Sequence, residues 1–489
     1  MAREYVLQPY RDSIKLQIDY EAELNDAQRT AVTALPGPAL VIAGAGSGKT
    51  RTLTYRVAYL LEQGVPADRI LLLTFTNKAA KEMMGRVADL IGHDMSDLWG
   101  GTFHSIGHRV LRRHAEDLGF DRSFTIQDRE DTKGLINACI AEAEIDVKAT
   151  RFPKPEVVAD MGSLAVNKQM DVRKVIEERF SWFEHLVPQI EGVIQRYTKR
   201  KRAQGLMDFD DLLVLWLKLL KEHEEVRELY QKRFQFVLVD EYQDTNQLQA
   251  ELIDLLGERY KNVMVVGDDS QSIYSWRGAN YENIIEFPDR YPGAKVYKIE
   301  TNYRSTPEIL NLANAAIAAN TRQFAKELSA SRGPGEKPIL AVCSAADEQA
   351  AFVAQRALEL REEGVELNDM AVLYRSHFHA LELQLEFTRR NIPFSITSGI
   401  RFFEQAHIKD VTSYLKWLAN PCDEQAFKRL VLMLPGVGSK TAFKLWGQFL
   451  AAHTDTIAQA AMLQKCEAVP KKAKVPWAQF SATVSQLET

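Results

Sequence analysis

The segment AGAGSGKT, residues 43–50, carries the clearest chemical signal in this 489-residue sequence. It continues an apolar run, LVIA, and resembles the pattern GxxxxGK[ST], with Ala43 at the first position and Gly48, Lys49 and Thr50 at the last three. Glycines at this spacing let backbone N–H groups approach phosphate oxygens, and the helix that begins there adds the positive end of its dipole. Lys49 is expected to reach the β- and γ-phosphates of ATP, and the Thr50 hydroxyl to bind Mg²⁺. The expected phosphate-binding residues are Gly44, Ala45, Gly46, Ser47, Gly48, Lys49, Thr50 and Arg51.

A second signal is the run FVLVDEYQD, residues 236–244. An apolar strand that ends in Asp-Glu places two carboxylates at the carboxyl edge of a parallel sheet, where ligands bind in such folds. We expect Asp240 to hold Mg²⁺ and Glu241 to orient or deprotonate the attacking water. An acidic surface loop is the plainer interpretation of this segment alone. Its combination with the glycine-rich loop favours an ATPase.

A third segment, VVGDDSQSIYSWRGA at residues 265–279, again ends a strand in acidic residues. Gln271 is a candidate sensor of the γ-phosphate. Tyr274, Trp276 and Arg277 follow closely, and exposed aromatic rings beside a cation offer stacking surfaces for unpaired bases. Two core aromatics would be the usual alternative, but the polar and glycine neighbours argue against a buried stripe.

The elements that must position these residues follow from apolar periodicity. Strands alternate with amphipathic helices over residues 38–91 and 235–391, which is typical of parallel sheets covered on both faces. Residues 101–206 show helical periodicity without a convincing strand, and helices dominate again after about residue 393. The predicted strands are PALVIA, RILLLTF, FVLVDE, NVMVVGD, KVYKIE, KPILAV and MAVLYR.

Composition is that of a soluble globular protein, with 46% apolar and 26% charged residues and a formal net charge of −5. No run approaches the roughly 18 apolar residues that a membrane helix needs, and the N-terminus does not resemble a signal peptide. Four cysteines without a CxxC pair argue against structural zinc and disulfides, so a cytoplasmic location is expected. Basic runs at 199–202 and 471–474 are interpreted first as solvated surface.

In their order along the chain, these motifs closely resemble those of the superfamily 1 helicases related to UvrD, Rep and PcrA. The resemblance runs from about residue 24 to 445. It rests on LNDAQRTAV (24–32), AGAGSGKT (43–50), TFTNKAAKEM (74–83), GTFHS (101–105), DFDDLL (208–213), DEYQDTN (240–246), GDDSQSIYSWRGA (267–279) and ETNYRS (300–305).

The resemblance implies roles for further residues. Gln28 matches the glutamine that reads the adenine edge, Tyr303 the aromatic that stacks on adenine, and Arg304 the arginine that contacts the γ-phosphate. RFFEQAHIKD (401–410) resembles a motif near the start of the second insertion, and LPGVGSKT (434–441) a hairpin that meets duplex phosphates, although a plain turn is equally consistent with it. Single-strand contacts are implied for Thr76, Asn77, Phe103 and His104.

The implied fold is α/β: two RecA-like parallel sheets, 1A and a partial 2A, with two mainly helical insertions, 1B and a partial 2B. In the family ATP binds between 1A and 2A, and single-stranded DNA crosses them. The expected boundaries are 1–100 with 207–285 for 1A, 101–206 for 1B, 286–392 for 2A and 393–489 for 2B.

The implied function is an ATP- and Mg²⁺-dependent DNA translocase and helicase with 3′-to-5′ polarity. Its expected partners are single-stranded DNA, single/double-strand junctions and replication or repair proteins, with no membrane, and it is expected to be a monomer or weak dimer. Two family motifs that follow 2B, one containing an arginine finger worth about 10³–10⁵ in rate, are not found in the sequence. We therefore expect slow hydrolysis by this chain alone. Ser270 stands where many relatives have Asp, and about twenty residues precede the adenine-reading segment.

Other interpretations remain open. A chain without those motifs could bind DNA or a protein partner and use nucleotide only as a gate. A nuclease-helicase subunit is less favoured because no acidic metal-binding cluster of that kind is visible. RNA is a possible substrate in principle, since base stacking does not distinguish the sugars.

Overall fold

The computed structural model of the protein describes residues 17–92, 95–376, 379–396, 406–452 and 458–488. The chain divides into two compact units, residues 1–335 with 412–489, and residues 336–411. Within the described ranges, no helix combines the length and the apolar character required to cross a membrane.

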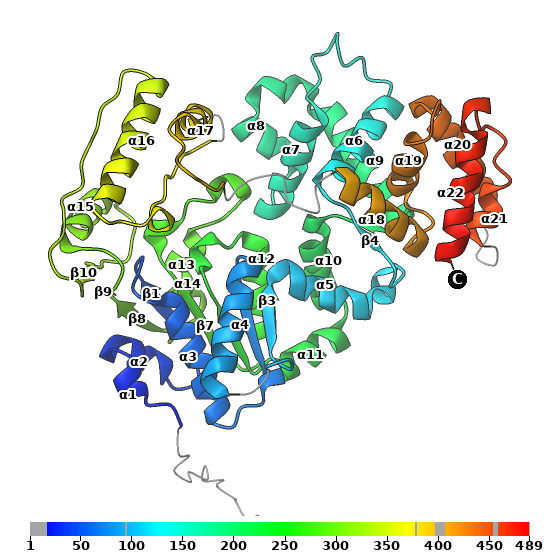
Figure 1. Ribbon diagram of the computed structural model, residues 1–489. Coiled ribbons are helices and arrows are strands. Elements are labelled where there is room, and N and C mark those ends of the chain that lie inside the picture. Colours follow the sequence, from blue (N-terminus) through cyan, green and yellow to red (C-terminus); the bar gives the residue numbers. More distant parts are fainter. Residues whose placement is uncertain (1–16, 93–94, 377–378, 397–405, 453–457, 489) are drawn as a thin grey trace, which may run out of the picture. The chain divides into compact units, whose positions relative to one another are not determined.

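The first unit is built on a six-stranded sheet in the order β3-β2-β6-β7-β1-β8, with every neighbouring pair parallel (Figure 1). Five of the seven predicted strands form in this sheet. Because parallel strands share a carboxyl edge, the loops that follow β1, β6 and β7 meet there. The strands are β1 (Ala39–Ala43), β2 (Ile70–Thr74), β3 (Trp99–Thr102), β6 (Phe236–Val239), β7 (Val263–Gly267) and β8 (Lys295–Ile299).

Each face of this sheet packs against helices, because successive strand residues point to opposite sides. Leu40 and Ile42 join one core, while Val41 and Ala43 join the other. The first core is covered by α5 (Phe103–His114), α10 (Phe209–Glu222), α11 (Glu224–Arg233) and α12 (Gln247–Gly257). The second is covered by α2 (Asp26–Val32), α3 (Lys49–Glu62) and α4 (Asn77–Ile91).

Strand β8 differs from its expected assignment. The expected boundary at residue 285 gives this strand to 2A, but it pairs with β1 over five residues and closes one edge of the first sheet. Helices α13 (Glu282–Ile285) and α14 (Phe287–Arg290) lead into it. The apolar pattern predicts the strand correctly, but pairing partners are not encoded in that pattern.

A separate helical core lies between the two halves of the sheet domain. It is formed by α6 (Arg129–Glu142), α7 (Pro155–Lys168), α8 (Val172–Arg179) and α9 (Val187–Ala203). At its base, β4 (Thr125–Ile126) pairs in parallel with β5 (Leu206–Met207). Helix α5, inside the expected insertion at 101–206, packs instead in the core of the sheet.

The C-terminal helices form another core, rich in aromatic residues. They touch the preceding helical core through ion pairs: Glu424, whose side chain is fully buried, pairs with Arg200, and Lys416 Nζ lies 2.8 Å from Asp131 Oδ2. These helices are α18 (Ala406–Ala419), α19 (Glu424–Leu432), α20 (Ser439–Ala452), α21 (Gln459–Leu463) and α22 (Lys474–Leu487).

The segment after β8 stays with the first unit. It holds β9 (Thr301–Asn302), α15 (Pro307–Ile317) and β10 (Ser329–Ala330), and the two short strands pair in parallel. This segment brings the ETNYRS motif beside the glycine-rich loop, since Tyr303 N donates to Gly46 O at 2.9 Å.

The second unit packs α16 (Ala346–Glu362) against α17 (Ala380–Arg389) around a small core of Ala354, Phe387 and Ile392. The predicted strands KPILAV and MAVLYR are wrong for this structure, because the described residues 337–342 and 370–375 contain no strand. Their apolar side chains are exposed, with Leu340 at 88% and Leu373 at 94%. Without a hydrogen-bonded neighbour, an apolar run does not become a strand.

Candidate functional site

The glycine-rich loop adopts a conformation that its glycines make possible. It joins β1 to α3, and Gly46 and Gly48 have φ of +72° and +88°. A Cβ at Gly48 would lie 2.6 Å from Gln28 Nε2, so a larger residue is excluded by strain and by space. Ser47 Oγ donates to Gly44 O at 2.8 Å and closes the loop.

The acidic pair after β6 lies opposite this loop. Lys49 Nζ donates to Glu241 Oε2 at 2.6 Å, across 192 residues of sequence. Glu241 holds φ at +49°, which is unusual for a residue with a side chain and is the kind of local strain that gathers at functional sites. The predicted meeting of the loop with the acidic pair is therefore present in the structure.

The electrostatics of the pair are unusual. Burial, with the neighbouring Glu241 charge, raises the pKa of Asp240 to about 7. Burial raises the pKa of Asp244 to about 7 as well, and its Oδ1 atom is buried without a hydrogen-bond partner. Buried carboxyls in this state gain most from a cation nearby, because a positive charge favours their ionised form.

A cavity of about 570 Å³ gathers most of the expected nucleotide-binding residues. Two residues of its wall, Glu82 and Arg86, escaped prediction; they come from α4 and form an ion pair at 2.5 Å. The TFTNKAAKEM motif could have indicated them, because it contains Glu82 and the same helix continues to Arg86. The expected residues in the wall are Ala45, Gly46, Gly48, Lys49, Thr50, Arg51, Glu241, Gln271, Tyr303 and Arg304.

These residues fit a triphosphate with a divalent cation. Lys49, Arg51, Arg86 and Arg304 bring four cationic side chains to the wall. Among the described residues no group of three or more His, Cys, Asp or Glu side chains could hold a metal ion. Mg²⁺ at this site would be held by Thr50 and Asp240 together with phosphate and water oxygens, as is usual for this ion.

At the expected adenine end, Tyr303 is 47% exposed and accepts a hydrogen bond from Asn25 Nδ2 at 2.8 Å. Gln28 is 2% exposed, and both ends of its amide are engaged. Its Oε1 accepts from Asn25 N at 3.2 Å, and its Nε2 donates to Ser47 O at 2.9 Å. These two bonds hold the Gln28 amide against the glycine-rich loop and leave it one N–H and one oxygen lone pair.

An aromatic surface follows β7 on the same edge. Trp276 is 55% exposed, and the Arg277 guanidinium lies 4.5 Å from the centre of its ring and 5.6 Å from that of Tyr274. Phe75, which sequence reasoning missed, stacks on Tyr274 with ring centres 5.2 Å apart. Phe75 lies in the TFTN part of the same motif, which could have indicated it. Trp276 and Arg277 are thus exposed side by side, and their contact with an unpaired base stays a prediction.

The other residues expected to contact single-stranded DNA differ in how far they are exposed. Thr76 caps α4 by accepting from Ala79 N, and the neighbouring Asn77 is exposed. His104 is partly exposed and packs edge-on against Phe209, and burial lowers its pKa. The expectation for Phe103 needs correction. It is the first residue of α5, its side chain is 3% exposed, and it packs in the core between α5 and the sheet.

Of the two C-terminal motifs, residues 401–405 of RFFEQAHIKD lie outside the described residues. In LPGVGSKT, Gly436 has φ of +80° and α20 begins at Ser439, so the segment is a turn that leads into a helix.

The site and the sheet together define a class. A parallel sheet with a phosphate-binding loop and an acidic pair at its carboxyl edge is a P-loop nucleotide-binding fold, which confirms the predicted fold class. Residues 24–292 match the UvrD/REP helicase N-terminal domain, and residues 297–462 match the UvrD-like helicase C-terminal domain. The chain belongs to the UvrD/REP helicase family.

Curated relatives carry the name ATP-dependent DNA helicase PcrA. Two from strains of Staphylococcus epidermidis and one from Staphylococcus aureus are each 38% identical over 424 residues. The match covers 86% of this chain and 57% of each relative. The chain thus spans little more than half of the length of the relatives it matches.

Proposed function

We propose that this chain carries the nucleotide site and the single-strand contacts of an ATP-dependent DNA translocase and helicase that moves 3′ to 5′ in replication or repair. Family membership supports the activity and the substrate class. The one observation that carries the proposal is the Lys49–Glu241 pair, 2.6 Å apart in a cavity of about 570 Å³ at the carboxyl edge of the sheet.

In this proposal Lys49 changes partners. Without nucleotide its ammonium group neutralises Glu241; with nucleotide it contacts phosphate oxygens, and Glu241 is released to orient or deprotonate a water. Thr50 and Asp240 would hold Mg²⁺, which would neutralise charge at the phosphates. Gln271 and Arg304, both in the cavity wall, contact the γ-phosphate.

The DNA contacts are proposed for Tyr274, Trp276 and Arg277, with Thr76, Asn77 and His104 beside them. Only two residues separate Gln271 from Tyr274 in sequence, so a change in the nucleotide cavity reaches the stacking surface over a short path. The proposed substrates are single-stranded DNA and single/double-strand junctions. Replication or repair proteins are the proposed partners of a monomer or weak dimer.

The test is DNA-stimulated ATP hydrolysis by this chain beside Lys49→Ala. We expect a low rate, because two family motifs are absent from these 489 residues. We also expect a fluorescent ATP analogue to bind the unchanged chain and to lose affinity by about 100-fold in the variant, since removing a buried charged contact to phosphate costs about 3 kcal/mol.

Two outcomes would redirect the proposal. Nucleotide binding that depends on Lys49, without any turnover on DNA, favours a nucleotide-gated DNA-binding protein. Equal nucleotide binding by the unchanged chain and Lys49→Ala would remove the basis of both interpretations.

A further inference from the structure

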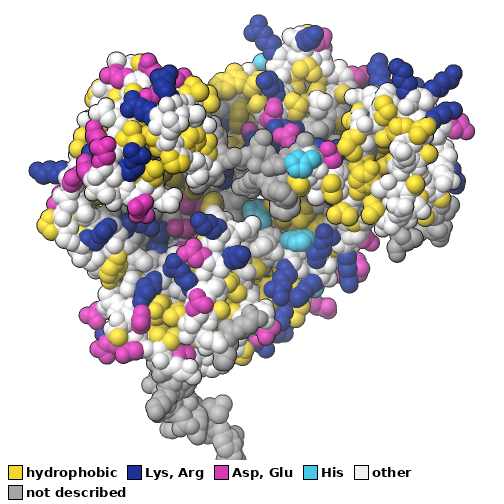
Figure 2. Space-filling view, viewed as in Figure 1, with side chains coloured by type: hydrophobic (Ala, Val, Ile, Leu, Met, Phe, Trp, Pro, Cys, Tyr) yellow, Lys and Arg dark blue, Asp and Glu magenta, His cyan; other side chains and the backbone are white. Residues whose placement is uncertain are grey.

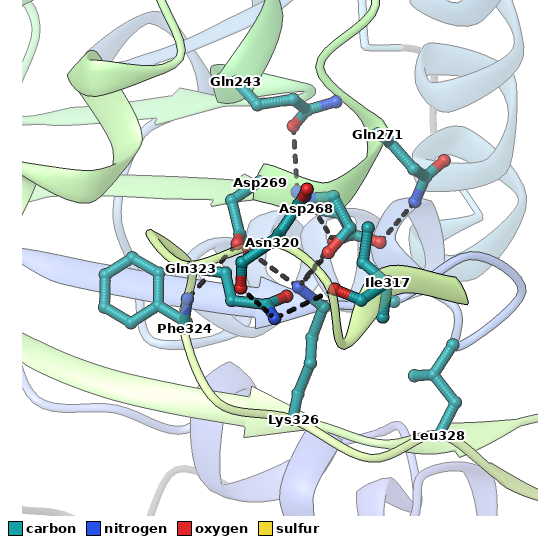
Figure 3. Close-up of polar contacts among 12 residues, drawn as sticks. Gln243, Asp268, Asp269, Gln271, Ile317, Asn320, Gln323, Phe324, Lys326 and Leu328 are labelled. Atoms are coloured by element: carbon teal, nitrogen blue, oxygen red, sulfur yellow. Dashed lines mark hydrogen bonds and ion pairs between the residues drawn. The ribbon is translucent and has the colours of Figure 1, made fainter. Parts of the chain in front are cut away.

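A buried lysine that sequence analysis did not single out lies next to the nucleotide site. Lys326 belongs to the segment between α15 and β10, and its side chain is only 5% exposed. Its Nζ lies 2.7 Å from Asp269 Oδ1, 2.9 Å from Asp268 Oδ1 and 2.8 Å from Ser270 Oγ. Figure 3 shows the lysine reaching up to both carboxyl groups at the end of β7.

The cluster is nearly saturated with hydrogen bonds. Phe324 N donates to Asp269 Oδ2 at 3.2 Å, and Ser270 N donates to Asp268 Oδ1 at 3.1 Å. The two acidic side chains are 3% and 2% exposed, so a single ammonium group lies between two buried carboxyl groups. Buried ion pairs add little net stability, but removing one partner leaves a charge uncompensated. The arrangement therefore fixes geometry more than it stabilises the fold.

That geometry leads directly to the nucleotide cavity. Gln271 Nε2 donates to Asp268 Oδ2 at 2.7 Å. Asp268 N donates to Gln243 Oε1 at 2.9 Å, and Gln243 Nε2 donates to Glu241 Oε2 at 2.8 Å. An amide has two N–H donors and one acceptor oxygen. With Asp268 taking one donor, Gln271 keeps a second donor and its Oε1 for a phosphate or a water.

On its other side, the segment of Lys326 touches the glycine-rich loop. Ser329 N donates to Glu300 O at 3.0 Å, and the β9–β10 pairing follows at once. A Cβ at Gly44 would lie 2.2 Å from Leu328 Cδ2, so this segment lies directly against the loop. Lys326 thus links the β9–β10 strand pair to Asp268, which accepts the hydrogen bond from Gln271.

We propose that Lys326 is a positioning residue: through Asp268 it orients Gln271 toward the terminal phosphate of a nucleoside triphosphate. The inference rests on the proposed function, because it takes the cavity as the nucleotide site. Without the ammonium group, Asp268 and Asp269 repel each other, and Asp268 no longer presents its Oδ2 atom to Gln271 at a fixed position. Loss of Lys326 should therefore weaken the preference of the site for ATP over ADP.

The test is the ratio of affinities for a non-hydrolysable ATP analogue and for ADP, both with Mg²⁺. Lys326→Met should lower this ratio by about fivefold or more, the effect of one lost hydrogen bond. Lys326→Arg keeps the charge and should retain most of the ratio. Lys298→Met is the matched control: Lys298 Nζ donates to Ala325 O at 2.6 Å, so it anchors the same segment without touching the acids.

A double substitution separates positioning from a merely structural role. In a Gln271→Ala background, Lys326→Met should leave the ratio unchanged, because the residue through which Lys326 acts is gone. An equal loss in both backgrounds would overturn the proposal, as would an unchanged ratio in Lys326→Met alone. If the single variant does not fold, Lys326→Gln, which removes the charge but leaves a polar side chain among the acids, gives the same readout.

Failure of this inference is distinguishable from failure of the proposed function. If the unchanged chain binds neither nucleotide, the nucleotide site and this inference are both wrong. The same holds if Lys49→Ala binds each nucleotide as tightly as the unchanged chain does. If binding depends on Lys49 while Lys326→Met keeps its preference for the triphosphate, only the role of Lys326 is overturned.

Discussion

Two regions of this molecule begin from the same kind of sequence and end differently. The strands β1, β2, β6 and β7 of the first unit are continuous apolar runs, and every residue in them is buried. The runs KPILAV and MAVLYR of the second unit are just as apolar, yet Leu340 and Leu373 are 88% and 94% exposed. Figure 2 shows hydrophobic side chains spread among charged ones on the surface.

This difference in burial shows how much structure an apolar run specifies by itself. It specifies that burial would be favourable, at about 25 cal/mol per Å² of apolar surface. It does not specify a neighbouring strand, and a strand needs that neighbour to satisfy its backbone N–H and C=O groups. In the first unit the neighbours come from segments as distant as β1 and β7, which are more than two hundred residues apart.

The largest effect that follows from this comparison is in hydrogen exchange. Amides of β1 and β6 should open only with a free energy close to that of global unfolding, about 5 kcal/mol or more. Amides of residues 339–342 and 371–374 should exchange with almost no protection. Mass spectrometry of exchanged peptides measures both regions in one sample. Comparable protection in the two regions would mean that the apolar runs of the second unit are as ordered as the strands of the first.

A core substitution should give the next largest effect. Leu72→Ala in β2 removes a side chain that is 0% exposed and should lower the free energy of unfolding by about 2–5 kcal/mol. The matched change Leu340→Ala should stay within about 0.5 kcal/mol. Denaturant titration followed by tryptophan fluorescence measures both, and a large loss in Leu340→Ala would mean that this residue is buried in solution.

Exposed apolar side chains need not be equivalent either. Trp276 is 55% exposed beside Arg277, whereas Leu373 is an exposed aliphatic side chain without a ring on which a base could stack. Trp276→Ala should weaken single-stranded DNA binding by about 1–3 kcal/mol, the value of one stacked base, with nucleotide binding retained. Leu373→Ala should leave DNA binding unchanged. Fluorescence anisotropy of a labelled oligonucleotide checks both, and equal affinities would count against a stacking role for Trp276.

Much of the nucleotide cavity was predictable because its residues come from short motifs with one chemistry. The spacing of Gly44 to Thr50 encodes the loop directly, and an acid after an apolar strand falls at the sheet edge by topology alone. Periodicity indicated the α/β class and predicted five of the six strands of the first sheet, but it missed β3 at its edge. Glu82 and Arg86 needed the further step of extending a motif along one helical face.

Other features were beyond sequence reasoning for physical reasons. Lys326 meets Asp268 and Asp269 only because the segment after α15 returns to the sheet edge, and no local pattern encodes that return. Phe103 was misassigned because a motif gives a residue's type and place but not the side to which it points. Gln28 pairs with Asn25 in a local capping box, whereas its bond to Ser47 depends on the packing of the helix against the loop.

The smallest expected effect concerns the acidic edge of the sheet, whose Asp240 has a pKa raised to about 7 by burial. The folded protein holds this proton between roughly pH 4, the value of an unperturbed Asp, and pH 7, while the unfolded chain has lost it. Stability therefore falls as pH rises through that range, and the full cost of the buried charge is present above pH 7.

Asp240→Asn should remove that cost. Without nucleotide and with Mg²⁺ chelated, the variant should melt at least about 2 °C above the unchanged chain at pH 8, and the difference should shrink toward pH 5, where Asp240 is protonated. Asp347→Asn in the second unit, at an exposed position, should shift the melting temperature at neither pH. Differential scanning calorimetry at the two pH values measures this, and a gain that is larger at pH 5 would reverse the sign on which the argument depends.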